Sequence, residues 1–387
     1  MTISYRLSDI YNLQMGKTPS RDNDTYWKDG EYEWISIADL SKCDKYISQT
    51  KEKITKKAVE ESGIHIIPAD TVIMSFKLSI GKVAITQKAL FSNEAIMAFI
   101  DKKVVSISPQ YAFYLFSAQN WDAGTNRAVM GSTLNKATLS QYRVLIHDVQ
   151  TQAEIVERLD KLSDLIRHRR QELQKLDDLV KSQFIEMFGD PVLNPYNWPI
   201  VNIGEIAIDV RYGTSKPAVE GGQYPYLRMN NLTYEGFLDL SNMKYIDIPD
   251  DEIEKYIVRK GDILFNRTNS IDLVGKTCVF DLDEAMIIAG YIIRIRLNDK
   301  LLPVVFSNYM NLPVLKKRLR NMAKGAVNQA NINAQELKSV RIYLPPIKLQ
   351  NQFAAFVEQT DKSKFRIKQN LEKLEILYKS LLQEYFG

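Results

Sequence analysis

Residues 171–189 read QELQKLDDLVKSQFIEMFG, and residues 369–387 read QNLEKLEILYKSLLQEYFG. The second stretch repeats the first at an offset of 198 residues, the difference between 369 and 171. The recurring residues include Gln171, Leu173, Lys175, Leu176, Lys181, Ser182, Phe188 and Gly189. A repeat over this distance indicates two copies of one large unit and not a short-period solenoid.

Each stretch ends a long segment whose apolar residues alternate in steps of four and three, the seam pattern of a coiled coil. In the first copy the seam residues are Ile155, Leu159, Leu162, Ile166, Leu173, Leu176, Val180 and Met187, with Arg169 and Gln183 as polar breaks in the same register. In the second copy they are Phe353, Val357, Ile367, Leu371, Leu374, Tyr378, Leu381 and Tyr385, with Thr360 and Lys364 as polar breaks. Neither copy has an internal Pro or Gly, so each predicts one helix of roughly 35 residues, about 50 Å long.

The two seams are expected to bury each other in an antiparallel pair, because a whole domain separates them in the chain. The alternative is a single long amphipathic helix that packs on an ordinary core.

The bulk composition fits a globular protein of two domains. The chain has 387 residues, an apolar fraction of 45% and a net charge of +4, and this excess permits nucleic-acid binding only where basic residues cluster. The only cysteines, Cys43 and Cys278, imply no disulfide framework, which suits a reducing cytoplasm. Residues 1–6 lack the apolar core of a secretory leader, and no apolar run is long enough to span a membrane.

The long helices divide the chain into two globular segments. We predict a first domain over residues 1–150, a central helix over 151–189, a second domain over 190–347 and a C-terminal helix over 348–387. Thr151, with Glu154 three residues later, predicts a capping box at the start of the central helix. Gly189 and Pro191 predict its end and a linker.

The two globular segments share a framework. In the first, strands are predicted over residues 34–37, 71–74, 83–85 and 144–146, a helix over 109–121 and a loop over 131–133. The corresponding positions are Leu7 and Ile203, Ile10 and Ile206, 34–40 and 226–232, Gly81 and Gly275, Lys82 and Lys276, and Val144 and Ile342. The polar residues between these positions differ, which predicts two binding sites with different targets.

The sequence gives little support for catalysis. A nucleotide or methyl-donor site would need a Gly-rich turn before a helix, and Gly213, Gly221 and Gly222 do not form one. The Asn-Pro-Tyr at 194–196 is shorter than a methyltransferase tetrapeptide, and Asp70 matches a nuclease motif only loosely. The three histidines lack metal-site spacing. We therefore expect a non-catalytic chain with no cofactor and no bound metal.

Polar loops at matching places in both halves suit nucleic acid better. Hydroxyls, amides and cations can contact phosphates, and Arg and Asn can also pair with base edges. In the first half the candidates are Lys17, Thr18, Arg21, Lys77, Ser79, Ser132 and Thr133. In the second half they are Thr214, Ser215, Lys216, Arg228, Asn230, Arg267, Thr268, Asn269, Asn328 and Gln329. Any single one could be a solvated loop residue, and it is the recurrence in both halves that favours function.

Together these features resemble the specificity subunit of type I restriction–modification systems over essentially the whole chain. Three local motifs carry the resemblance. They are the Gly-Asp-Ile-Leu of 261–264 before Gly275 and Lys276, the Gly-Ser-Thr of 131–133, and the Leu-Pro-Pro-Ile of 344–347 ahead of Gln350. The first half departs from the last motif, because His-Asp-Val-Gln at 147–150 replaces the double proline.

The resemblance implies an α+β fold with two pseudo-repeated, mixed β-rich target-recognition domains, joined by two long antiparallel coiled-coil helices. Each domain would read one half of a split sequence in double-stranded DNA. The implied partners are two DNA methyltransferase subunits and two restriction (translocase) subunits, which would carry the chemistry. The helix surface with Arg167 and Arg170 is a candidate docking site.

Two other readings remain open on the sequence. The first is a protein-interaction scaffold, with two domains on a coiled coil that bind proteins and not a DNA sequence. Salt dependence separates it from the DNA reading, because several phosphate contacts make affinity fall steeply with salt. The second is a lone methyltransferase or nuclease, which would have to bind a methyl donor or cut DNA by itself.

Overall fold

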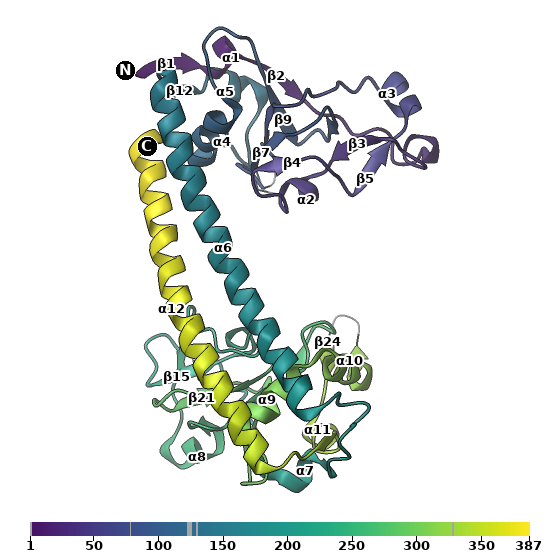
Figure 1. Cartoon of the computed structure of the whole chain (residues 1–387), viewed down its shortest axis with the longest axis vertical. Coiled ribbons are helices and arrows are strands. Elements are labelled where there is room, and N and C mark those ends of the chain that lie inside the picture. The colour runs from purple at the N-terminus through teal and green to yellow at the C-terminus, as the bar shows by residue number, and fades with distance from the viewer. Residues whose placement is uncertain (1, 78, 122–125, 129–130, 327–328) are drawn as a thin grey trace. The chain divides into compact units, whose positions relative to one another are not determined.

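The computed structural model describes residues 2–77, 79–121, 126–128, 131–326 and 329–387. The chain forms two compact units. Unit 1 comprises Met1–Arg170 and Gln369–Gly387, and unit 2 comprises Gln171–Lys368. Each unit therefore contains one globular domain together with a segment of both long helices (Figure 1).

The long helices are α6 (Val149–Phe188) and α12 (Ile347–Phe386), each of 40 residues. Both begin slightly earlier than predicted. The prediction that Thr151 caps α6 is wrong, because Thr151 lies inside the helix. Asp148 takes that role, and its carboxylate accepts hydrogen bonds from the Thr151 amide (3.0 Å) and hydroxyl (2.9 Å). An aspartate at this place also offsets the positive end of the helix dipole.

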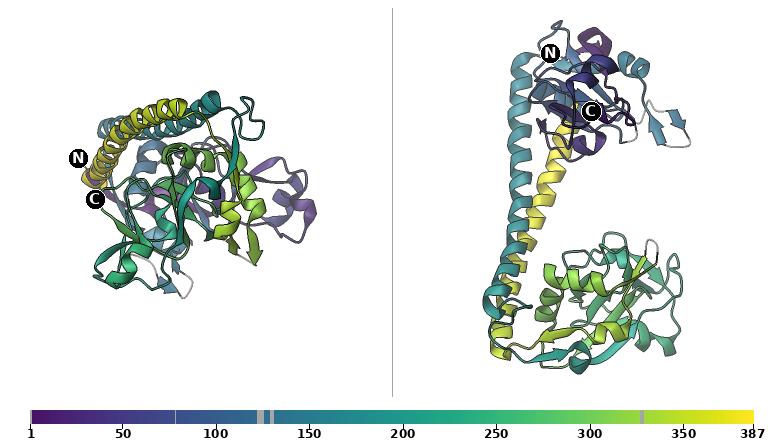
Figure 2. Two further views of the ribbon diagram at one scale, coloured as in Figure 1. Left: turned by 90° about the horizontal axis from the view of Figure 1, so that it is seen from below. Right: turned by 90° about the vertical axis from the view of Figure 1, so that its right-hand side faces the viewer.

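The two helices lie side by side and antiparallel within each unit (Figure 2). In unit 1, Arg170 pairs with Glu375 at 2.6 Å and Arg158 donates to the Tyr385 hydroxyl at 3.2 Å. In unit 2, Lys364 pairs with Asp177 at 2.7 Å. All the predicted seam residues are buried or half-buried. Arg170 thus holds the partner helix and does not point away from the seam, whereas Arg167 pairs with Asp164 on its own helix.

Unit 1 is built from short strands and helices around a five-stranded sheet. Its helices are α1 (Leu7–Ile10), α2 (Ile37–Leu40), α3 (Lys56–Ser62), α4 (Pro109–Ala118) and α5 (Lys136–Gln141). Its strands are β1 (Thr2–Arg6), β2 (Tyr11–Met15), β3 (Tyr32–Ile35), β4 (Tyr46–Ile47), β5 (Glu52–Ile54), β6 (Val72–Ser75), β7 (Val83–Thr86), β8 (Phe91–Ser92), β9 (Ile96–Asp101), β10 (Asn126–Ala128), β11 (Gly131–Thr133) and β12 (Arg143–His147). The main sheet has the order β2-β9-β6-β7-β4, and a smaller sheet has the order β5-β3-β8.

Unit 2 repeats this plan. Its helices are α7 (Ile203–Ile206), α8 (Ile253–Tyr256), α9 (Pro303–Asn311), α10 (Pro313–Met322) and α11 (Ala334–Lys338). Its strands are β13 (Ile200–Asn202), β14 (Ala207–Tyr212), β15 (Tyr224–Leu227), β16 (Lys244–Ile246), β17 (Ile257–Val258), β18 (Ile263–Asn266), β19 (Thr268–Asn269), β20 (Thr277–Val279), β21 (Met286–Ile288), β22 (Ile292–Leu297), β23 (Lys324–Ala326), β24 (Gln329–Asn331) and β25 (Arg341–Tyr343). The order β14-β22-β18-β20 matches β2-β9-β6-β7, and β15 pairs in parallel with β21 as β3 does with β8.

Two local predictions for the first domain are corrected. Residues 131–133 are not a loop but strand β11, which pairs antiparallel with β10. The strand predicted over 34–37 ends at Ile35, because Ser36 caps α2. The Ser36 hydroxyl accepts from the Asp39 amide (3.2 Å), and the Asp39 carboxylate accepts from the Ser36 amide (3.0 Å). This capping box favours a helical turn over continued strand.

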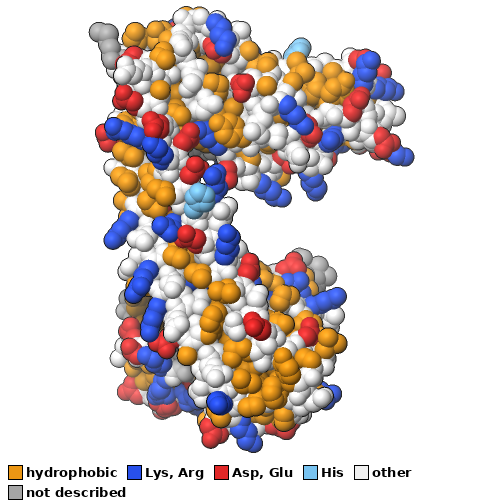
Figure 3. All heavy atoms as spheres, in the orientation of Figure 1, with side chains coloured by type: hydrophobic (Ala, Val, Ile, Leu, Met, Phe, Trp, Pro, Cys, Tyr) orange, Lys and Arg blue, Asp and Glu red, His pale blue; other side chains and the backbone are white. Residues whose placement is uncertain are grey.

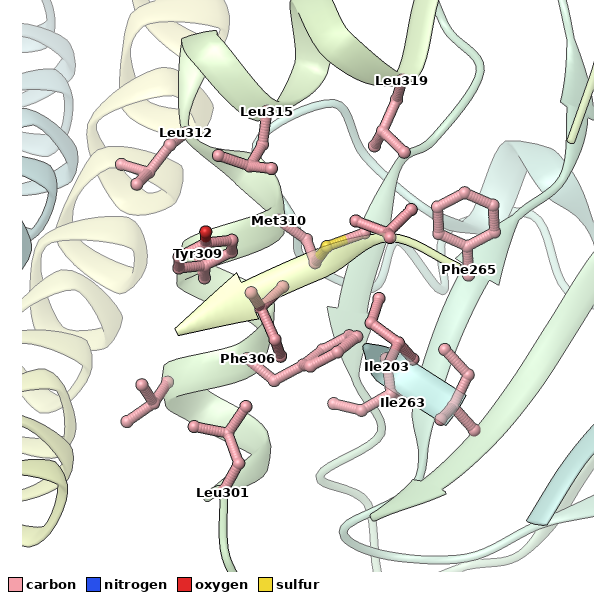
Figure 4. Packing of buried hydrophobic residues seen from close by; sticks show 14 of the residues in the cluster. Ile203, Ile263, Phe265, Leu301, Phe306, Tyr309, Met310, Leu312, Leu315 and Leu319 are labelled. Carbon is pink, nitrogen blue, oxygen red and sulfur yellow. The ribbon is translucent and has the colours of Figure 1, made fainter. Parts of the chain in front are cut away.

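The core of unit 2 extends from the domain into the helices. Side chains of α7, β18, α9 and α10 pack together (Figure 4). The same cluster takes in Phe184 and Phe188 of α6 and Phe353 of α12, whose rings meet edge to face at 4.9–5.3 Å. In unit 1, Ile155 and Leu159 of α6 likewise belong to the domain core. The domains are therefore not complete without the helices.

We predict that Phe353→Ala destabilises the protein by about 3–5 kcal/mol, because the ring is fully buried between the two other phenylalanines. Urea denaturation followed by circular dichroism measures the effect. Phe365→Ala on the same helix is the control, since that ring is 62% exposed and its loss is expected to cost about 0.5 kcal/mol or less. Equal losses for the two variants would contradict this role of the core.

Candidate nucleic-acid interface

Unit 2 contains a cavity of about 500 Å³ that gathers six of the predicted residues. They come from three separate loops. The six are Thr214, Ser215, Lys216, Arg228, Asn230 and Arg267. Tyr226 and Tyr291 add aromatic walls. Sequence reasoning missed these two tyrosines as site residues, although Tyr226 lies in the framework strand β15 and Tyr291 directly precedes β22.

The loop after β14 is held against the sheet by its backbone. The Gly213 amide donates to the Ile292 carbonyl at 3.1 Å, and the Thr214 amide donates to the Ile288 carbonyl at 2.9 Å. A Cβ at Gly213 would lie 2.2 Å from the Ile288 carbonyl oxygen, so only glycine permits this approach. The Tyr226 hydroxyl fixes the far side of the loop by donating to the Thr214 and Lys216 carbonyls.

The two arginines of the cavity have incomplete hydrogen bonding. Arg228 donates to the Asn242 carbonyl at 2.8 Å. Arg267 donates to the Asn331 side chain at 3.2 Å and to the Gly290 carbonyl at 3.4 Å, and its guanidinium lies 4.7 Å from the centre of the Tyr212 ring. The Nε of each arginine is buried without a hydrogen-bond partner. Both side chains therefore retain donors for an incoming acceptor.

The remaining candidates of unit 2 are less available. Thr214 and Thr268 are buried, and the Thr268 hydroxyl accepts from Asn331 at 2.8 Å. Asn269 donates to the Asn266 side chain at 2.8 Å, and Lys216 pairs with Glu252 at 2.8 Å. Gln329 is exposed in β24, and Asn328 lies outside the described residues. The exposed candidates beside the arginines are thus Ser215 and Asn230.

In unit 1 the matching loop has the same backbone contacts. The Gly16 amide donates to the Ile96 carbonyl at 3.1 Å, and the Lys17 amide donates to the Ser92 carbonyl at 2.8 Å. The Trp34 indole donates to the Lys17 carbonyl at 3.1 Å, in the place of Tyr226. The framework proposed from the sequence repeat therefore extends to the hydrogen bonds of the loop.

Carboxylates hold the candidate side chains of this unit 1 loop. Thr18 donates to Glu94, and Arg21 forms two hydrogen bonds with Glu52 at 2.6 and 3.1 Å. The Arg21 guanidinium also lies 3.8 Å from the centre of the Trp27 ring. Burial raises the pKa of Glu94, but hydrogen bonds led by that of Thr18 outweigh it, and the net pKa is lowered. Glu94 is therefore an ionised acceptor.

Of the other candidates of unit 1, Lys77 acts on the same carboxylate, because its charge is one of the causes that lower the pKa of Glu94. Lys77 is half-buried, with its ammonium 5.3 Å from the centre of the Phe76 ring, and Ser79 is exposed. Ser132 and Thr133 belong to β11. Sequence reasoning missed Glu52 and Glu94, and aligning residues 92–96 with 288–292 would have exposed the second of them.

The charged side chains of the chain form no large basic field on the face shown in Figure 3, where Lys and Arg alternate with Asp and Glu. Among the described residues, no helix combines the length and apolar character needed to cross a membrane.

The family model described as Type I restriction modification DNA specificity domain matches residues 3–177 and 195–376. This chain belongs to that family. The two matched segments agree with the repeat seen in the sequence.

Several curated relatives carry the same function in their names. The MjaIX specificity subunit of Methanocaldococcus jannaschii is 27% identical over 250 residues, which cover 59% of this chain and 57% of that protein. The EcoKI subunit of Escherichia coli is 26% identical, over 48% of this chain and 42% of that protein. The match thus spans about half the length of these relatives. The StySPI subunit of Salmonella potsdam is 22% identical over 98% of this chain and 87% of that protein.

Two solved structures share the fold. The specificity subunit from M. genitalium superimposes with a TM-score of 0.51 at 14% identity, over 100% of this chain and 96% of that one. A chain from a study of the assembly and conformational transition of the type I system gives a TM-score of 0.58 at 18% identity, over 99% and 97%. The predicted α+β class with two repeated domains and long helices is confirmed.

We predict that Gly213→Ala loosens the loop that lines the cavity of unit 2. The added methyl must push the loop away from the Ile288 and Ala289 carbonyls, at an expected cost of about 1–3 kcal/mol. Amide hydrogen exchange should speed up at Thr214 and Gly290, whose amides bond across this contact. Ser215→Ala, an exposed position of the same loop, is the control, and unchanged exchange in Gly213→Ala would refute the prediction.

Proposed function

We propose that unit 1 and unit 2 each read one half of a split sequence in double-stranded DNA. The observation that carries this proposal is the repeated loop framework, with unlike side chains at equivalent positions of the two units. Backbone contacts at Gly16 and Gly213 present the loops in the same way, while the side chains beside them differ in charge. A duplicated scaffold with different polar loops suits two different targets.

The joining elements support a target with a gap of fixed length. The chain passes from unit 1 to unit 2 through α6 and back through α12, and neither helix contains an internal Pro or Gly. Helical connections restrain the two readers more than flexible linkers would. The number of unread base pairs between the half-sites is therefore expected to be constant.

Methyltransferase and restriction subunits would supply the chemistry, with this chain contributing specificity and no catalytic step. The helices offer docking surfaces for them. Leu179 in unit 2 and Leu377 in unit 1 occupy the same position of the repeated stretch, and they are 46% and 48% exposed. A single exposed leucine is common on protein surfaces, and it is the recurrence at the same repeat position that favours contact with a partner. Two copies of one surface support two copies of one partner, the methyltransferase subunit.

The proposal of two half-sites is tested by exchanging residues 1–150 for the first domain of another family member. The methylated bases are mapped by genome sequencing in a host that expresses the chimera with its methyltransferase. We expect one half of the methylated motif to change, while the other half and the gap stay the same. A change in both halves, or a motif without a gap, would argue against one reader per domain. A parent chain that shows no DNA sequence preference would favour a protein scaffold.

The docking proposal is tested with Leu179→Glu and Leu377→Glu. Each charge falls on one copy of the surface, so each single variant should keep one methyltransferase subunit and the double variant should keep none. Native mass spectrometry of the purified complexes gives the stoichiometry. The control is Lys175→Gln with Lys373→Gln, at exposed repeat positions that leave both leucines intact. A double variant that still carries two subunits would show that docking occurs elsewhere.

A further inference from the structure

Equivalent positions of the two units differ in charge in a consistent direction. The first is Arg228, which corresponds to Ser36 of unit 1. The Arg228 amide donates to the Asn231 side chain at 2.9 Å, and the Ser36 amide donates to the Asp39 side chain at 3.0 Å. Arg228 directly follows β15, which pairs in parallel with β21, and Ser36 directly follows β3, which pairs in parallel with β8. At one place in the framework, unit 2 therefore carries a cation where unit 1 carries a small hydroxyl.

The second position is Arg267, which corresponds to Phe76. The Arg267 amide donates to the Tyr291 carbonyl at 2.9 Å, as the Phe76 amide does to the Ala95 carbonyl at 3.0 Å. The Arg267 carbonyl accepts from the Ile332 amide at 2.9 Å, and the Phe76 carbonyl accepts from the Leu134 amide at 3.1 Å. The Phe76 ring is 1% exposed and belongs to the core. Unit 2 thus replaces a core ring by a guanidinium that lines its cavity.

The third position is Gly290, which corresponds to Glu94. Each lies two residues before the carbonyl that accepts from the loop glycine, at Ile292 in unit 2 and at Ile96 in unit 1. Unit 1 places an ionised carboxylate here, hydrogen-bonded by Thr18. In unit 2 the residue at this place has no side chain. At these three positions unit 1 therefore carries one negative charge, and unit 2 carries two positive charges.

The unit 2 cavity lacks a counter-charge for its arginines. Within the described part of the chain, neither Arg228 nor Arg267 forms an ion pair, although Lys216 pairs with Glu252. Both Nε atoms are buried without acceptors, and a buried donor left unpaired is unfavourable until an acceptor arrives. Among the residues that the structure describes, no carboxylate lines the cavity. The two arginines therefore fit a ligand group that presents hydrogen-bond acceptors to them.

We propose that unit 2 selects guanine at one position of its half-site through Arg228 and Arg267. This inference rests on the proposed reading of DNA by both units. In the major groove guanine presents two acceptors, O6 and N7, which match the fork of an arginine, whereas adenine and cytosine present an amino group there. Guanidinium groups offer only donors, so they cannot pair with an amino group, and thymine presents only one acceptor beside a methyl group. A phosphate offers the same acceptor chemistry, and the test separates the two.

The test uses the full-length chain and a library of random duplex DNA, with bound sequences read by sequencing. The variants are Arg228→Lys and Arg267→Lys, because lysine keeps the charge for a phosphate but loses the bidentate fork. We expect the parent chain to enrich a split motif with a guanine in one half. Each variant should relax the choice of base at that guanine by about tenfold or more, while the other half of the motif stays unchanged and shows that the variant is folded.

Two matched variants sharpen the result. Arg211→Lys replaces an exposed arginine of β14 that pairs with Asp209 at 2.8 Å and lies outside the cavity, so it should leave the motif unchanged. Glu94→Gln should alter only the half-site read by unit 1.

The remaining outcomes overturn the inference. A uniform loss of affinity for all sequences in Arg228→Lys and Arg267→Lys would assign both arginines to phosphate. Exchange of residues 1–150 identifies the half-site read by unit 2, because that half stays unchanged. If this half contains no guanine, the guanine assignment is refuted, while the proposed function stands. Failure of the parent chain to enrich any split motif would overturn the proposed function together with this inference.

Discussion

The antiparallel contact between α6 and α12 is the constraint on which both domains depend. In unit 2 it buries Phe184, Phe188 and Phe353 in the same cluster as the domain core. Each unit therefore draws its core from segments far apart in the chain, and neither domain can bury its apolar surface with its own strands alone. Lys364 helps to fix the register of the two helices, because its buried ammonium pairs with both Asp177 and Asp361. A slip of one residue would leave that charge unpaired in the seam.

The long helices were the most predictable part of the fold, and their ends were the least. Seam residues at steps of four and three must face one side of a helix, and all of them are buried or half-buried. The start of α6 depends on which of two nearby side chains accepts hydrogen bonds from the unpaired backbone amides of the first helical turn. Asp148 and Thr151 are both good caps by type, and only the observed hydrogen bonds distinguish them.

The candidate site was predictable as a set of loops but not as a set of contacts. The repeat located the loops around Gly16 and Gly213, because a close approach of backbones leaves a glycine at the same place in both copies. It did not reveal that Thr214 and Thr268 are buried. Nor did it reveal that Glu52 and Glu94 hold Arg21 and Thr18, because these partners lie 31 and 76 residues away in the chain. Ion pairs over such distances follow from the fold and leave no local pattern.

The division of labour between backbone and side chains explains how one scaffold can serve two unlike targets. The loops of both units are anchored by main-chain hydrogen bonds, such as those of Gly16 and Gly213, which do not depend on the neighbouring side chains. Arg267 and Phe76 show the consequence, since their main-chain contacts are the same although one side chain is charged and the other apolar. A framework held in this way tolerates a change of charge at its recognition positions. The chemistry of each recognition surface can then vary independently of the packing that positions it.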